Sequence, residues 1–389
     1  MKIIDMDHKG NGIGKINNKV VFVPKSIIGD ECEIDIIKSY KNYDVAKIEK
    51  ITKKSDKRID VLCPHYEVCG GCNISNLEYQ EQLKFKENKV KNIFKKYLGM
   101  DIKPRVIDSE KEFEYRNKIT YHYDHNLGLI SEFGGVINID KCLLVSDRVN
   151  HLYKKIKEND LSRVKLVTIK ECDNGLILSI MGEMKIDNLC DLCIEINVNN
   201  KTVYKKEDGF ITLNDIKYRV SDRAFFQVNT SNICKLYDEI VRYGEFKETD
   251  EVIDLYCGVG SISLYIAKYV KSVLGIEIVA DAIRDAKENA KINKINNVSF
   301  LCGDVSKLID DNINGDILIV DPPRVGIDEY SLKVINDSRI NKIIYVSCDP
   351  MTLVRDIKKL DNYKLSNISV VDMFPQTHHC ESICFLERK

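Results

Sequence analysis

The sequence predicts an α/β protein with a C-terminal Rossmann-like domain, preceded by a small OB-like β-barrel and a central α+β segment. From about residue 216 onward, short apolar runs alternate with helical stretches of ten or more residues, which is typical of a parallel sheet covered by helices. Residues 1–53 instead contain short alternating runs separated by glycine turns, which favours a small barrel. A chain of 389 residues is long enough for two or three such units.

The domain boundaries follow from these changes of pattern. We expect a barrel over residues 1–53, ending at the polar junction that follows it, and a central domain over residues 54–215. The central domain should contain an amphipathic helix from Leu77 to Leu98 and then antiparallel strands. Residues 216–389 would form the C-terminal domain.

The composition is that of a soluble globular protein. With 44% hydrophobic residues, 31% charged residues and 7 prolines, it excludes collagen-like, disordered and coiled-coil classes. No apolar run approaches the ~20 residues that span a bilayer, and Met1 to Asp5 lack the apolar core of a signal peptide. We therefore expect a cytoplasmic protein with no membrane association, in which the 14 cysteines are thiols, metal ligands or catalytic groups rather than disulfides.

The charge is unevenly distributed along the chain. The net charge is −1, yet residues 1–100 carry 19 Lys and Arg against 14 Asp and Glu, a net charge of +5. A basic N-terminal region on a near-neutral chain indicates a polyanionic partner, although a solvated charged surface would give the same count. Barrels of the OB type commonly bind single-stranded nucleic acid.

The turn after the first strand of the C-terminal domain has features of a cofactor site. Residues 254–261 place Gly258 where the backbone can approach a ligand at a helix N-terminus, although a tight strand–helix turn would need the same glycines. Ser263 stands where a dinucleotide motif would have its third glycine. Glu277, 19 residues after Gly258, is placed to bind ribose hydroxyls, and Asp304 to face an adenine. This set favours an adenosine cofactor without a pyrophosphate, and S-adenosylmethionine fits that description.

Further candidate functional residues follow the later strands. Asp321 ends the fourth strand before two prolines that would fix a rigid loop. Cys348 follows the fifth strand beside a helix N-terminus, where we expect a lowered thiol pKa and a nucleophilic role; the alternative is a buried small hydrophobe. Glu381, near the C-terminus, is the first candidate for a base and His379 the second, although a solvated loop would also fit the pattern.

These segments together resemble the RNA uracil-C5 methyltransferase family. The motifs that carry the resemblance occur in the family's order: Phe225–Asn229, Asp254–Gly258, Asp321–Arg324, Ser347–Pro350 and Phe374–Glu381. Residues 1–53 also resemble the family's N-terminal TRAM barrel, so the resemblance covers nearly the whole chain. It implies that Cys348 is the nucleophile and Glu381 the general base, and that S-adenosylmethionine is bound by Gln227, Tyr256, Glu277 and Asp321.

A group of cysteines predicts a metal site in the central domain. Cys63, Cys69 and Cys72 have the spacing C-x5-C-x2-C, and the fourth ligand could be Cys142 or the pair Cys190 and Cys193. The spacing leaves zinc and iron–sulfur open. The resemblance to the cluster-bearing branch of the family implies a four-iron four-sulfur cluster with Cys142 as its fourth ligand.

We therefore expect an enzyme that forms 5-methyluridine in 23S ribosomal RNA through a covalent adduct between cysteine and uracil C6. Methylation of a transfer RNA uridine is the alternative. A non-catalytic RNA-binding protein is a third class, which the presence of Cys348, Glu381 and the cofactor residues argues against. The sequence indicates no obligate protein partner.

Overall fold

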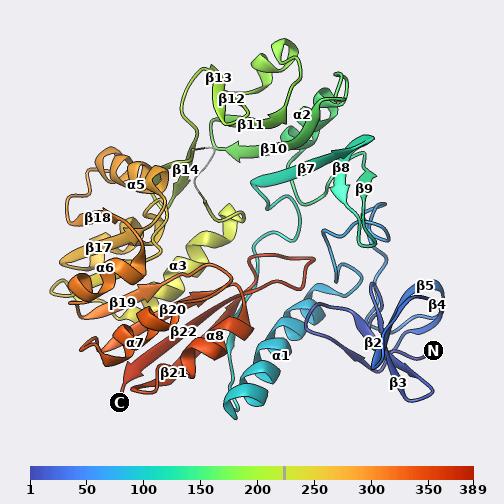
Figure 1. Cartoon of the computed structure of the whole chain (residues 1–389), viewed down its shortest axis with the longest axis horizontal. Coiled ribbons are helices and arrows are strands. Elements are labelled where there is room, and N and C mark those ends of the chain that lie inside the picture. Colours follow the sequence, from blue (N-terminus) through green and yellow to red (C-terminus); the bar gives the residue numbers. More distant parts are fainter. Residues whose placement is uncertain (222–224) are drawn as a thin grey trace.

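The computed structural model describes residues 1–221 and 225–389 (Figure 1). Within these residues a five-stranded sheet comes first, followed by a seven-stranded sheet, a two-stranded hairpin and an eight-stranded sheet that ends the chain. No helix in this described part is long and apolar enough to cross a membrane.

The N-terminal sheet curls into the predicted barrel because its two edges meet. The strand order is β1-β2-β3-β5-β4, and a bridge between Lys2 and Glu31 joins the residues before β1 to the start of β4. Ile3, Val21 and Val23 point inward and are fully buried in a small core. The strands are β1 (Asp5–Met6), β2 (Gly12–Ile16), β3 (Lys19–Val23), β4 (Glu31–Ser39) and β5 (Tyr43–Lys53).

The predicted amphipathic helix is present as α1 (Tyr79–Leu98), which ends at Gly99 in a left-handed conformation. A seven-stranded sheet follows, covered by α2 (Asp147–Ile156), with Tyr121 and Tyr153 stacked in the core between them. Its strand order is β13-β12-β11-β10-β7-β8-β9. The strands are β7 (Lys118–Asp124), β8 (Asn126–Ile130), β9 (Val136–Asn138), β10 (Val164–Cys172), β11 (Gly175–Gly182), β12 (Glu195–Val198) and β13 (Lys201–Lys205), with the short helix η1 (Asp187–Leu192) before β12.

A hairpin of β14 (Phe210–Leu213) and β15 (Ile216–Arg219) leads into the C-terminal domain, which opens with α3 (Thr230–Gly244). The eight-stranded sheet has the order β18-β17-β16-β19-β20-β22-β21-β6. Its elements are β6 (Arg105–Ile107), β16 (Glu251–Leu255), α4 (Ser261–Ile266), η2 (Ala267–Tyr269), β17 (Ser272–Glu277), α5 (Ala280–Ile292), β18 (Val298–Cys302), α6 (Val305–Asn312), β19 (Ile317–Val320), α7 (Glu329–Asp337), β20 (Lys342–Ser347), α8 (Pro350–Ile357), β21 (Tyr363–Val371) and β22 (Glu381–Arg388).

Strands β16 to β20 are parallel, as predicted, so their carboxyl ends meet at one edge of the sheet. The last strand differs from the others. β22 is antiparallel to both β20 and β21, because the chain turns back from β21 without a crossover helix. This arrangement brings the C-terminal motif beside the end of β20.

Helices cover both faces of the large sheet, and one of them comes from far away in the sequence. Val90, Ile93 and Phe94 of α1 share a core with residues of α7, α8 and β22. In Figure 1, α1 lies between the barrel and this sheet. Residues before the C-terminal domain therefore form part of the surroundings of its strands.

Candidate active site and cysteine pocket

The glycine turn after β16 leaves open space beside its backbone. Tyr256 and Gly258 both have positive φ angles, of 64° and 55°, and the Tyr256 amide donates to the carbonyl of Ile276 at 2.8 Å. A Cβ atom at Gly258 would meet nothing within 4 Å. The turn therefore presents backbone, with open space beside it, at the N-terminus of α4.

Glu277 and Asp304 lie on adjacent strand ends. The Glu277 carboxylate accepts hydrogen bonds from the amides of Gly258, at 3.2 Å, and Val279, at 2.8 Å. The Glu277 carbonyl accepts from the amide of Gly303, which fixes the loop after β18 beside it. Asp304 caps α6 by accepting from the Ser306 amide at 3.0 Å.

Gln227 does not follow a strand of the large sheet but lies in the segment before α3. It is buried, and its carbonyl accepts from the side-chain amide of Asn117 at 3.0 Å. It therefore lies on the approach to α3, held against the segment that leads into β7.

A buried carboxyl group, that of Asp254, and a half-buried one, that of Asp321, lie behind the glycine turn. The Asp321 amide approaches the Leu255 carbonyl at 3.4 Å, which places Asp321 next to the end of β16. Burial raises the pKa of Asp254 to about 7. Burial, together with the nearby Asp254, raises the pKa of Asp321 as well. Ser263, where a dinucleotide motif would have glycine, donates to the Asp254 carboxyl, which gives this serine a structural role.

Cys348 and Glu381 face each other. The register of the antiparallel pair joins Ser347 of β20 to Ser382 of β22, so the next residues outward are Cys348 and Glu381. Glu381 also pairs with Val371 of β21 and is only 2% exposed. Its Oε2 atom has no hydrogen-bond partner among the residues that the structure describes. A buried carboxyl with a free oxygen opposite a half-buried thiol is an arrangement suited to acid–base and nucleophilic chemistry.

The electrostatics of this pair correct one expectation. Burial, then the neighbouring Glu381, raises the pKa of the Cys348 thiol to about 11, although Arg324 opposes the shift. The predicted lowering of the thiol pKa by a helix N-terminus is wrong, because burial and the neighbouring carboxyl groups outweigh it. Burial and Asp321 likewise raise the pKa of Glu381 well above its usual value.

The adjacent histidines are neutral at physiological pH. Burial, with Arg324 nearby, lowers the pKa of His379 to about 4, and burial lowers that of His378 to about 3. His378 Nδ1 lies 2.8 Å from Asn73 Oδ1. His379, the second candidate for the base, therefore lies near Arg324, as does Glu381, the first candidate.

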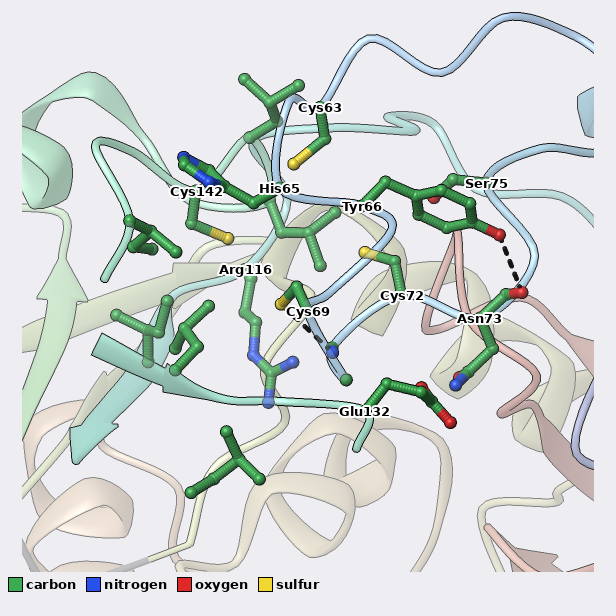
Figure 2. Close-up of a pocket in the computed structure, with 18 of the residues that line it drawn as sticks. Cys63, His65, Tyr66, Cys69, Cys72, Asn73, Ser75, Arg116, Glu132 and Cys142 are labelled. Atoms are coloured by element: carbon green, nitrogen blue, oxygen red, sulfur yellow. Dashed lines mark hydrogen bonds between the residues drawn. The ribbon is translucent and has the colours of Figure 1, made fainter. Parts of the chain in front are cut away.

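The four predicted metal ligands line one pocket of about 720 Å³. Figure 2 shows the sulfur atoms of Cys63, Cys69, Cys72 and Cys142 arranged around a common space. Cys190 and Cys193 pack instead with the core of the seven-stranded sheet. Within the described residues, however, no three His, Cys, Asp or Glu side chains are spaced to hold a metal ion, so the iron–sulfur site stays a prediction.

The comparisons with known proteins agree on one family. A model of the tRNA (Uracil-5-)-methyltransferase family matches residues 193–389, and a model of the TRAM domain matches residues 2–49. The chain belongs to the RNA (uracil-5)-methyltransferase family. It is an S-adenosylmethionine-dependent RNA (uracil-C5)-methyltransferase with an N-terminal TRAM domain, as the resemblance implied.

Full-length relatives support this family assignment. An uncharacterized RNA methyltransferase of Clostridium tetani is 31% identical and aligns over 99% of this chain and 95% of its own length. One from Bacillus cereus is 32% identical over 98% of this chain and 95% of its own. The crystal structure of the Pyrococcus abyssi tRNA (uracil-54, C5)-methyltransferase, in complex with S-adenosyl-L-homocysteine, has a TM-score of 0.82 at 25% identity and covers 99% of both chains.

Sequence reasoning missed two residues of this methyltransferase. Arg324 is one of them, since it opposes the rise in the pKa of both Cys348 and Glu381. Its place directly after the proline pair was the available signal. Lys25 of the TRAM barrel is buried and donates to the carbonyl of Cys69 at 3.0 Å and to that of Cys72. No local pattern in the sequence indicated that contact.

Proposed function

We propose that this methyltransferase acts through a covalent adduct in which Cys348 is the nucleophile and Glu381 the general base. The observation that carries the proposal is the strand register that aligns Cys348 with Glu381, whose buried Oε2 atom has no hydrogen-bond partner among the described residues. Uracil C5 is a poor nucleophile, and addition of a thiolate to C6 moves electron density onto C5. S-adenosylmethionine, when bound, supplies the methyl group that C5 takes up.

The residues of the chain then complete the reaction. Glu381 removes the C5 proton, the C5–C6 double bond re-forms, and the thiolate leaves from C6. Arg324 favours the anionic thiol, because its charge opposes the shift that burial causes in the pKa of Cys348. The target base must leave its stack to reach a site of this depth, which favours an unpaired or loop uridine.

For the cofactor we propose a site formed by Gln227, Tyr256, Glu277, Asp304 and Asp321. The open space beside Gly258 and the half-buried Glu277 carboxylate support it, since a ribose needs a close backbone approach and an acceptor for its hydroxyls.

We further propose that Cys63, Cys69, Cys72 and Cys142 hold a four-iron four-sulfur cluster. Each thiolate of such a cluster ligates a different iron, so the four sulfurs stand further apart than the ligands of one ion. Their arrangement around one space supports this reading. We assign the cluster the task of organising the central domain and the RNA surface, because methyl transfer needs no electron.

The RNA itself has two candidates. The resemblance of the chain to the cluster-bearing branch favours 23S ribosomal RNA, whereas the similarity to the Pyrococcus abyssi tRNA (uracil-54, C5)-methyltransferase favours transfer RNA. Mapping 5-methyluridine in both RNA classes from a deletion strain separates them: loss from one class identifies the substrate.

The reaction is tested by trapping. RNA with 5-fluorouridine at the target should bind the wild-type enzyme covalently, because fluorine does not leave as a proton does. Glu381→Gln should accumulate a methylated protein–RNA adduct that resists denaturant, and Cys348→Ala should form none. An adduct in Cys348→Ala would transfer the nucleophile role to another thiol, and normal turnover of Glu381→Gln would remove the base role from Glu381.

A further inference from the structure

The connection between β21 and β22, residues 372–380, is a buried strap without regular secondary structure. Its two ends converge on the pair of Val371 and Glu381. The proposed base is thus the first residue after the strap, at the end of a strand. Terminal strand pairs fray unless something else holds them.

The strap is held by side chains from outside it. Its backbone carbonyls accept hydrogen bonds at 2.9 to 3.1 Å from donors on α1, on the segment before β7 and at the start of α3. The donors and their acceptors are Lys86 to Phe374, Lys89 to His378, Tyr115 to Pro375, Asn229 to Met373 and Asn232 to Asp372. So complete a set of backbone contacts fixes one conformation of a loop.

At the centre of the strap, Gln82 of α1 and Gln376 form a reciprocal pair. The Gln376 amide donates to Gln82 Oε1 at 2.9 Å, and Gln82 Nε2 donates to Gln376 Oε1 at 3.1 Å. Both residues are almost fully buried. Gln376 has a φ of 70°, and its carbonyl accepts from the amides of Asn73 and Ile74, next to the cysteine pocket. The residue sits in a strained conformation that its partners maintain.

A buried ion pair adds a second attachment to α1. Lys86 Nζ lies 2.5 Å from Asp372 Oδ1, and both side chains are at most 1% exposed. Tyr79 donates to the other Asp372 oxygen at 3.0 Å. Both charges are buried, so each would be left uncompensated if the strap moved away from α1, and the pair ties the position of the strap to that helix.

We propose that Gln82, Lys86 and Gln376 are positioning residues for the reaction: they hold the strap against α1 so that Glu381 stays covered and opposite Cys348. The inference rests on the proposed role of Glu381. None of the three touches the reacting atoms. A loosened strap would let water reach Glu381 and misplace its carboxyl, which slows removal of the C5 proton after the adduct has formed.

The test uses Gln82→Met, which keeps the side-chain volume, and Gln376→Asn, which tolerates the left-handed conformation. The matched control is Gln80→Met, because Gln80 is exposed on the same helix. Each full-length variant is assayed with target RNA for turnover, for the methylated covalent adduct, for S-adenosylmethionine affinity and for melting temperature. We expect kcat to fall roughly 10–100-fold in both variants, with adduct accumulation and unchanged cofactor affinity.

The double variant should lose no more than Gln82→Met alone, because that change already removes both hydrogen bonds, whereas Gln376→Asn keeps the backbone amide that donates to Gln82. Lys86→Met provides an independent third variant, which should accumulate adduct as well. Elimination at the wild-type rate in these variants would overturn the inference. Turnover could also fall together with melting temperature and cofactor affinity while no adduct accumulates. That result would give the residues a purely structural role and would overturn the inference too. If 5-fluorouridine RNA fails to trap the wild-type enzyme, the proposed function itself is wrong.

Discussion

The resting enzyme should have an unreactive nucleophile. Burial raises the pKa of Cys348 from an ordinary thiol value near 9 to about 11. At pH 8 a thiol with that pKa is ionised to about 0.1%, against about 10% for an unshifted thiol, a difference of about a hundredfold. Since the thiolate is the reactive species, alkylation of Cys348 should be slower by the same factor. Arg324→Met should slow it further, because the guanidinium opposes the rise in pKa.

The assay is iodoacetamide labelling of the free protein between pH 7 and 10, with each cysteine followed by mass spectrometry. Exposed Cys302 is the internal reference for an accessible thiol. We expect Cys348 labelling to rise tenfold per pH unit across this range, because the pKa of the thiol lies above it. Labelling of Cys348 as fast as Cys302 at pH 8, or faster labelling in Arg324→Met, would refute the argument.

Three other changes test separate parts of the molecule. Cys72→Ser should remove the iron and its visible absorbance after anaerobic purification and lower the melting temperature, because thiolate–metal bonds contribute folding energy; a colourless wild-type protein would contradict the cluster. Tyr40→Ser should weaken RNA binding by about 1–3 kcal/mol if a base stacks on the exposed pair of Tyr40 and Tyr43, whose rings lie 4.6 Å apart; the control is Tyr330→Ser, on α7. Glu277→Gln should reduce S-adenosylmethionine affinity roughly tenfold in calorimetry through loss of a charged acceptor; unchanged affinity would remove Glu277 from the site.

Local patterns predicted those parts of the fold that depend on neighbours in the sequence. The alternation of strands and helices located the parallel strands. Because the carboxyl ends of parallel strands share an edge of the sheet, the same pattern predicted that four residues lie at that edge: Tyr256, Glu277, Asp304 and Asp321. The antiparallel direction of β22 has no such local signal. That direction sets Glu381 opposite Cys348. The position of each residue in the sequence suggested it as a candidate, but only the strand register shows how the two are aligned.

Residues that act through distant contacts could not be found in this way. Gln82 lies on a helix whose apolar positions explain its packing, and nothing near it in the sequence indicates a partner at Gln376. The prediction of a lowered thiol pKa for Cys348 was wrong for a similar reason. A sequence motif shows the nearby helix but shows neither the burial of the thiol nor the carboxyl group of Glu381 beside it.

The TRAM barrel illustrates what such a contact means for experiments. Its division from the rest of the chain at residue 53 is a prediction, and a truncation there would be the simplest test of RNA binding by the barrel. Lys25, however, donates from the barrel to the carbonyls of Cys69 and Cys72, and its own carbonyl accepts from Arg58 and Asn76 at 2.7 Å. Removing residues 1–53 would therefore strip the cysteine loop of a buried cation and leave those donors unpaired. Because Asn73 and Ile74 of the same loop hold Gln376, the damage would extend to the strap that covers Glu381. A point change on the barrel surface, such as Tyr40→Ser, separates RNA binding from catalysis where a truncation cannot.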